Sequence, residues 1–176
     1  MQQQHRINVM ILDDHPVVRE SYALGLEREA DISICGTYAT VLDLRTALQT
    51  ICPDVLLMDF NLGPSESDGI QLIRSLAAQY PRMRILLISG YCTPATVMLA
   101  MQTGATGFVS KSQTLQVVSA AVRAVHAGRP WISGELELVG VERFLRSKQP
   151  VTGSLADNSS LSARESEVLR CCLQGM

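Results

Sequence analysis

Short apolar runs alternate with amphipathic stretches of helical length throughout the first 128 residues of this chain. The runs Val55–Met58 and Ile85–Ile88 are apolar at every position, which is typical of strands that are covered on both faces. Between the runs, apolar residues recur with a period near 3.6, which predicts helices that bury one side. The expected strands are Val9–Leu12, Ile32–Cys35, Val55–Met58, Ile85–Ile88 and Gly107–Val109, and the expected helices are Val17–Arg28, Val41–Thr50, Gly69–Gln79, Pro94–Thr103 and Leu115–Ala127.

Five strand–helix units in strict alternation predict an α/β fold, a doubly wound, five-stranded parallel sheet with helices on both faces. Local signals agree with the element boundaries. Thr93 and Pro94 form the usual N-cap and first-turn pair of a helix, and Gly104 and Gly128 stand where glycines end helices. Because 47% of the 176 residues are hydrophobic, the chain has enough apolar side chains for such a core.

The pattern changes after Gly128, so three segments are expected. Residues 1–128 form the sheet domain, and residues 129–160 form a linker with one helix around Glu135–Arg146. The end of this linker, residues 149–160, is rich in Pro, Gly, Ser, Asn and Asp. In residues 161–176, a capping box precedes an apolar stripe and predicts the first helix of a second domain. Because this segment is too short to bury a core of its own, we expect a truncated domain.

Charge and cysteine usage exclude several classes of protein. Only 18% of the residues are charged and the net charge is −2, which counts against nucleic-acid binding by these residues. The five cysteines lack CxxC spacing, so neither disulfides nor a cysteine metal site is expected. The first residues, MQQQHRIN, lack the apolar core of a signal peptide, and no apolar run approaches about 18 residues. We therefore expect a cytoplasmic protein that does not associate with membranes.

Polar side chains follow four of the five expected strands. The first strand ends in Asp13 and Asp14, and the third ends in Asp59. The fourth ends in Ser89, and the fifth runs to Lys111. In an open parallel sheet, ligands bind outside the carboxyl ends of the strands. We therefore expect these five side chains to lie at one rim and to form a single site.

Three carboxylates, a hydroxyl and an ammonium group suit a phosphoryl group beside Mg²⁺. Carboxylates brought together repel one another unless a cation lies among them, and their hard oxygen atoms suit Mg²⁺. The ammonium group of Lys111 can neutralise further negative charge, and the hydroxyl of Ser89 can donate to an oxyanion. Because a carboxylate can itself be a nucleophile, phosphoryl transfer to this site would give an acyl phosphate.

The stretches MILDDHPVVR, VLLMDFNLG, ILLISGY and GFVSK resemble the receiver domains of two-component response regulators, over roughly residues 7–127. The order and spacing of Asp59, Ser89 and Lys111 fit that family. The resemblance implies a flavodoxin-like fold and makes Asp59 the acceptor of a phosphoryl group from the phosphohistidine of a sensor histidine kinase. It also implies a signalling protein that catalyses its own phosphorylation and dephosphorylation, rather than an enzyme.

The resemblance also implies which residues hold the metal. Asp14 would bind Mg²⁺ directly, and Asp13 would act largely through metal-bound water. The backbone carbonyl of Asn61 would supply another ligand. Together with Asp59, these residues would complete the magnesium site.

Four side chains would act on the phosphorylated form. Lys111 would pair with a phosphoryl oxygen, and Ser89 would hydrogen-bond to one. When Ser89 moves towards the phosphoryl group, the ring of Phe108 could turn inward, so that the two residues act as a switch. Ser89 stands where threonine is commoner in the family. Tyr91 is bulky, and we expect it to slow the attack of water on the acyl phosphate.

The tail LSARESEVLRCCLQGM resembles the opening of a LuxR-type helix-turn-helix domain, as found in NarL/FixJ-type regulators. This second resemblance implies a regulator of transcription that pairs as a homodimer on twofold DNA sites. The recognition helix of such a domain is not among these residues. DNA binding is therefore expected only through the missing part of the domain.

Three alternatives compete with a receiver that accepts a phosphoryl group. A phosphatase or phosphotransferase of the haloacid dehalogenase type also uses an aspartyl nucleophile, Mg²⁺ and a lysine. It needs a second acid two residues after the nucleophile, where this chain has Asn61, whose amide cannot donate a proton at neutral pH. A dinucleotide-binding domain is disfavoured because DDHP, and not GxGxxG, follows the first strand. A receiver that takes no phosphate and serves as a protein-interaction module stays an open alternative.

Overall fold

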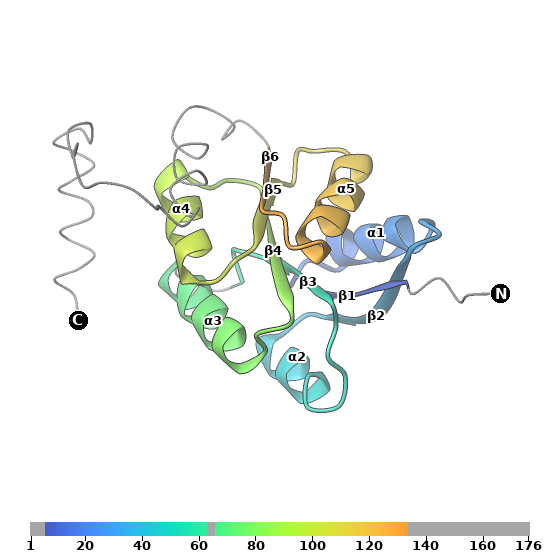
Figure 1. Ribbon diagram of the computed structural model, residues 1–176, viewed down its shortest axis with the longest axis horizontal. Coiled ribbons are helices and arrows are strands. Elements are labelled where there is room, and N and C mark those ends of the chain that lie inside the picture. The colour runs from blue at the N-terminus through green and yellow to red at the C-terminus, as the bar shows by residue number, and fades with distance from the viewer. Residues whose placement is uncertain (1–5, 63–65, 134–176) are drawn as a thin grey trace, which may run out of the picture. The chain divides into compact units, whose positions relative to one another are not determined.

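The computed structural model describes residues 6–62 and 66–133, which form one β-sheet with helices on both faces (Figure 1). These residues belong to one compact unit, Met1–Arg146. Strands and helices alternate strictly, which confirms the α/β fold class. The elements are β1 (Ile7–Leu12), α1 (Pro16–Leu26), β2 (Ile32–Tyr38), α2 (Val41–Ala47), β3 (Val55–Asp59), α3 (Glu66–Gln79), β4 (Arg84–Ser89), α4 (Pro94–Thr103), β5 (Gly107–Ser110), α5 (Leu115–His126) and β6 (Trp131–Ser133).

The strand order is β2-β1-β3-β4-β5-β6, and all neighbouring strands are parallel. The chain begins inside the sheet with β1, adds β2 on one side and then continues with β3 on the other. This reversal of direction leaves a crevice beyond the carboxyl ends of β1 and β3. Leu12 lies opposite Met58 in the register of these two strands. The residues that follow, Asp13 and Asp59, therefore become neighbours.

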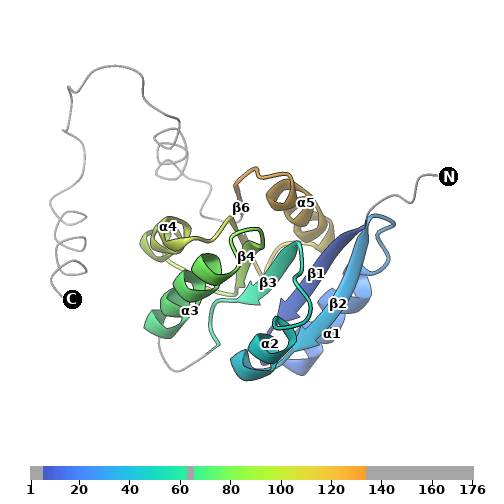
Figure 2. The same ribbon diagram turned by 60° about the horizontal axis from the view of Figure 1, so that its bottom comes forward.

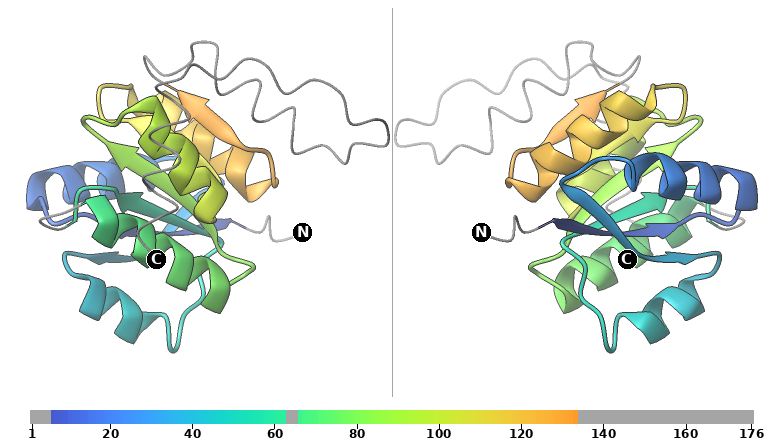
Figure 3. Two further views of the ribbon diagram at one scale, coloured as in Figure 1. Left: turned by 90° about the vertical axis from the view of Figure 1, so that its left-hand side faces the viewer. Right: turned by 90° about the vertical axis from the view of Figure 1, so that its right-hand side faces the viewer.

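Different helices bury the two faces of the sheet. In β3, Leu56 and Met58 join the core that includes residues of α2, α3 and α4, whereas Val55 and Leu57 join the core that includes residues of α1 and α5. Figures 2 and 3 show these two groups of helices on opposite sides of the sheet. Every residue of β3 is buried, which explains why this strand is apolar up to its final aspartate.

Helix boundaries follow the local signals in the sequence. The hydroxyl of Thr93 caps α4 by accepting a hydrogen bond from the backbone N–H of Thr96 at 3.2 Å, and Pro94 occupies the first turn. Gly104 and Gly128 follow α4 and α5 with φ angles of 135° and 76°, a region that favours glycine. Among the helices of the described residues, none combines the length and the hydrophobicity needed to span a lipid bilayer.

A sixth strand extends the sheet beyond the five that the sequence predicted. β6 pairs in parallel with β5, with Trp131 opposite Gly107. We expected this segment to begin the linker, but three residues are too few to show either a strand or a helix period. The helices expected around Glu135–Arg146 and in residues 161–176 lie outside the described residues.

Candidate functional site

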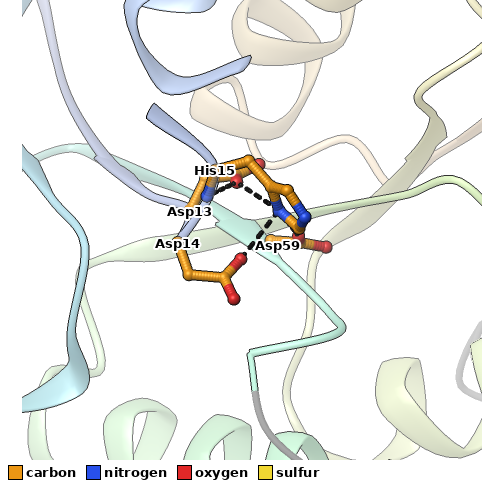
Figure 4. Close-up of side chains that lie close together, drawn as sticks. All are labelled: Asp13, Asp14, His15 and Asp59. Atoms are coloured by element: carbon orange, nitrogen blue, oxygen red, sulfur yellow. Dashed lines mark hydrogen bonds and ion pairs between the residues drawn. The ribbon is translucent and has the colours of Figure 1, made fainter. Parts of the chain in front are cut away.

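The carboxyl ends of four strands bring the polar residues singled out in the sequence to one rim. Asp59 and Ser89 end β3 and β4, while Asp13 and Lys111 directly follow β1 and β5. Figure 4 shows that the side chains of Asp13, Asp14 and Asp59 gather beyond the ends of these strands. The backbone N–H of Lys111 donates to the carbonyl of Ser89 at 2.8 Å, which continues the β4–β5 pairing up to the rim.

Lys111 links two buried carboxylates. Its Nζ atom lies 2.8 Å from Asp13 Oδ2 and 2.7 Å from Asp59 Oδ2, and each aspartate is only 1% exposed. Burial by itself lowers the pKa of Lys111, but the hydrogen bonds and charges of Asp59 and Asp13 outweigh it and raise the pKa above its usual value. Lys111 is therefore firmly protonated and neutralises part of the negative charge at the rim.

His15 also lies in this cluster, although the sequence analysis did not assign it a role. Its Nδ1 atom is 2.8 Å from Asp14 Oδ1, 3.3 Å from Asp13 Oδ1 and 4.0 Å from Asp59 Oδ2 (Figure 4). Its backbone N–H donates to Asp13 Oδ1 at 2.8 Å. The signal that could have identified it is its position directly after two acidic residues at the end of a strand.

The donor set at the rim can hold a metal ion. One ligand atom from each of Asp13, Asp14, His15 and Asp59 can be chosen so that all four lie within 4.8 Å of one another. Three carboxylates and one ammonium group leave an excess of negative charge, which a divalent cation would neutralise. The backbone N–H of Asn61 donates to Asp59 Oδ1 at 3.1 Å, so the Asn61 peptide also lies beside this cluster. Carboxylate and carbonyl oxygens are ligands that suit Mg²⁺.

Hydrogen bonds hold the Ser89 side chain away from solvent. Ser89 is fully buried, and its hydroxyl donates to the carbonyl of Tyr91 at 2.8 Å. The same hydroxyl oxygen accepts hydrogen bonds from Asn61 Nδ2 at 3.2 Å and from the backbone N–H of Tyr91 at 3.3 Å. The contact between the Asn61 amide and Ser89 was not foreseen from the sequence. It ties the loop after β3 to the end of β4.

Phe108 lies behind this rim, in the core. It lies on β5, opposite Leu87 of β4. The ring is 2% exposed and belongs to the same buried cluster as Val97, Ala100 and Met101 of α4. A displacement of Phe108 would therefore require repacking beneath α4.

Known proteins resemble this chain both in sequence and in structure. A family model described as the response regulator receiver domain matches residues 9–123. The oxygen regulatory protein NreC of Staphylococcus aureus is 27% identical over 170 residues, covering 96% of this chain and 78% of NreC.

Solved structures share the fold of the sheet domain. A LuxR family two-component response regulator from Aurantimonas sp. SI85-9A1 is similar with a TM-score of 0.71 and 27% identity, over 80% of this chain and 99% of that one. The RcsB response regulator of Salmonella typhimurium gives a TM-score of 0.68 and 26% identity, over 98% of this chain and 79% of RcsB. A structure of two RcsB dimers bound to two parallel DNAs gives a TM-score of 0.69 and 25% identity, with the same coverage.

The substitution Lys111→Met tests the electrostatic account of the rim. Without the ammonium group, Asp13 and Asp59 are two buried carboxylates that repel each other, so we expect the free energy of unfolding to fall by about 3 kcal/mol. Because folding raises the pKa of Lys111, this residue stabilises the folded state fully at any pH below its ordinary pKa of 10.5. The stabilisation is lost only as the pH rises through the raised pKa. The loss should therefore be the same at about pH 7 and at about pH 9.

Urea unfolding in the presence of a chelator, followed by circular dichroism, measures this loss. The control is a double-mutant cycle with Asp59→Asn, which removes one of the two like charges. The double variant should be more stable than the sum of the two single effects predicts. Additive effects would show that Lys111 and Asp59 are not coupled.

Proposed function

Because the chain belongs to the response regulator receiver domain family, we propose that Asp59 accepts a phosphoryl group from the phosphohistidine of a sensor histidine kinase. A receiver domain of a two-component response regulator is a signalling protein and not a classical enzyme. The observation that favours Asp59 is that it contacts Lys111 and also lies on the strand next to β4, which ends in Ser89. It contacts Lys111 Nζ at 2.7 Å, and it lies opposite Ile88, the residue before Ser89. Asp13, which follows β1, is one strand farther from β4.

In the proposed reaction, a carboxylate oxygen of Asp59 attacks the phosphorus of phosphohistidine, the P–N bond breaks, and the imidazole leaves with the electron pair. Lys111 already contacts the nucleophile and can move to a phosphoryl oxygen. Asp13, Asp14 and the backbone carbonyl of Asn61 would hold Mg²⁺, which when bound neutralises charge on the phosphoryl oxygens. Water later attacks the phosphorus, releases inorganic phosphate and restores the carboxylate. The receiver itself provides the groups that stabilise charge, so it catalyses both steps.

The hydroxyl of Ser89 would carry the signal away from Asp59. To donate to a phosphoryl oxygen, it must give up its hydrogen bond to the Tyr91 carbonyl. Such a movement would leave space at the end of β4, and Phe108 lies on the neighbouring strand β5 and shares a buried cluster with α4. We therefore propose that Ser89 and Phe108 form a two-state switch whose output surface is α4, β5 and α5.

The output of this switch would be regulation of transcription in the cytoplasm. The tail at residues 161–176 resembles the start of a LuxR-type helix-turn-helix domain. The similarity to RcsB covers 98% of this chain, and RcsB has been solved as dimers bound to DNA. We propose by analogy that the regulator forms homodimers and contacts DNA through the part of the helix-turn-helix domain that these residues do not include.

Intact mass spectrometry after incubation with Mg²⁺ and a small acyl phosphate tests the phosphoacceptor directly. The wild-type chain should gain one phosphoryl group, and Asp59→Asn should gain none because the nucleophilic oxygen is lost. The control is Asp43→Asn, which removes an exposed carboxylate of α2 and should leave phosphorylation intact. A wild-type chain that gains no mass, or an Asp59→Asn variant that gains as much as the wild type, would refute the assignment.

Tyr91 should prolong the lifetime of the phosphorylated state. Its side chain is 77% exposed at the rim, two residues after Ser89, where its ring can obstruct the approach of water. We expect Tyr91→Ala to accelerate loss of the phosphoryl group by about threefold. The decay of the phosphorylated mass after removal of the donor measures this rate. Leu24→Ala, which truncates an equally solvent-facing apolar residue on α1, is the control, and an unchanged half-life in Tyr91→Ala would rule out the shielding role.

A further inference from the structure

We propose that His15 supplies a nitrogen ligand to the divalent cation of this site and thereby sets its metal preference. The inference rests on the proposed function, in which a cation lies among Asp13, Asp14 and Asp59. With an imidazole added to the oxygen ligands, the site should discriminate in favour of transition metals such as Co²⁺ more strongly than the carboxylates alone would.

The distances from His15 Nδ1 match those between ligands of one metal ion. Adjacent ligands of an octahedral ion with bonds of about 2.1 Å lie about 3.0 Å apart, and opposite ligands lie about 4.2 Å apart. Nδ1 is 2.8 Å from Asp14 Oδ1 and 3.3 Å from Asp13 Oδ1, close to the separation of adjacent ligands. Its distance of 4.0 Å from Asp59 Oδ2 is close to that of opposite ligands. Small side-chain movements would therefore let these atoms share one ion.

The backbone places the imidazole at the site without a rearrangement of the loop. The N–H of His15 donates to Asp13 Oδ1 at 2.8 Å, and its carbonyl accepts from the backbone N–H of Arg19 at 3.0 Å. Pro16 follows at the start of α1 and restricts the backbone further. Two backbone bonds and a proline therefore hold the residue at the rim, and only side-chain torsions remain to adjust.

A change of tautomer gives Nδ1 a lone pair that can bind a metal ion. In the geometry described, Nδ1 lies at hydrogen-bond distance from Asp14 Oδ1 and can donate to it. The side chain is 64% exposed, so a neutral imidazole can instead carry its proton on the other ring nitrogen, in contact with water. Nδ1 then presents a lone pair to the carboxylate cluster. Figure 4 shows this nitrogen directed towards the carboxylates of Asp13 and Asp14.

The chemistry of the ligands predicts a differential effect of His15. Mg²⁺ prefers oxygen ligands and keeps several waters, so it gains little from an imidazole. Co²⁺, Ni²⁺ and Zn²⁺ bind imidazole well. Any carboxylate site favours these metals to some extent, so the informative quantity is the ratio of the Mg²⁺ and Co²⁺ dissociation constants and how that ratio depends on His15.

Isothermal titration of Co²⁺ and of Mg²⁺ into the unphosphorylated chain, with every measurement at the same pH, measures this ratio. The reference chain and all variants carry Cys52→Ser, because the exposed free thiol of Cys52 could bind Co²⁺. For His15→Asn we expect the Kd for Co²⁺ to rise about tenfold. Even the loss of a residue that only hydrogen-bonds to a metal ligand weakens metal binding by at least about this factor. The Kd for Mg²⁺ should change by less than about twofold. The visible absorption of bound Co²⁺ should also shift when the nitrogen ligand is lost.

The control is His126→Asn, which removes an exposed histidine at the end of α5 and should leave both constants unchanged. If His15→Asn alters the Co²⁺ and Mg²⁺ constants by the same factor, or alters neither, His15 is not a ligand and the inference fails while the magnesium site stands. If the wild-type chain binds neither metal, the metal site of the proposed function fails as well. These two failures are therefore distinguishable without any phosphorylation assay.

Discussion

An ammonium group held between two buried carboxylates organises this site. Lys111 Nζ lies 2.8 Å from Asp13 Oδ2 and 2.7 Å from Asp59 Oδ2. Charges withdrawn from water in this way are tolerated only when they are paired and hydrogen-bonded. The parallel sheet makes the pairing possible, because strands far apart in the sequence end at the same rim. One ammonium group cannot neutralise three carboxylates, and the remaining negative charge is what suits the rim to a divalent cation and, once the cation is bound, to a phosphoryl group.

Much of the fold and of the site could be predicted because both follow from patterns that are local in the sequence. A run such as Val55–Met58 identifies a strand buried on both faces, and in a parallel sheet the residue that ends such a strand must lie at the rim. β6 escaped prediction because its three residues show no period, and its pairing depends on how the chain turns after α5. The sequence also could not predict which side chains form hydrogen bonds with one another at the rim. The hydrogen bond from Asn61 Nδ2 to Ser89 Oγ joins the loop after β3 to the end of β4 and depends on side-chain rotamers, and the direction of His15 depends on the turn after β1.

These unforeseen contacts bear on how the receiver would work. Ser89 is fully buried, and its hydroxyl already forms hydrogen bonds with Tyr91 and Asn61. In the proposed mechanism, phosphorylation must offer it a better hydrogen-bond acceptor than the Tyr91 carbonyl, and charged acceptors do form stronger hydrogen bonds than neutral ones. Asn61 contacts both residues that take part in this exchange of hydrogen bonds. Its backbone N–H donates to Asp59, and its side-chain amide donates to Ser89. The loop after β3 would thus couple Asp59, the proposed phosphoacceptor, to Ser89, the first residue of the proposed switch.

A crystal structure of the chain with Mg²⁺ and beryllium trifluoride, a mimic of the phosphoryl group, tests the central claim most directly. The account predicts beryllium bonded to a carboxylate oxygen of Asp59, one fluoride in contact with Lys111 Nζ, and the Ser89 hydroxyl moved from the Tyr91 carbonyl to another fluoride. Beryllium bonded to a different side chain, or a fluoride group on Asp59 without contact to Lys111 and Ser89, would contradict the account.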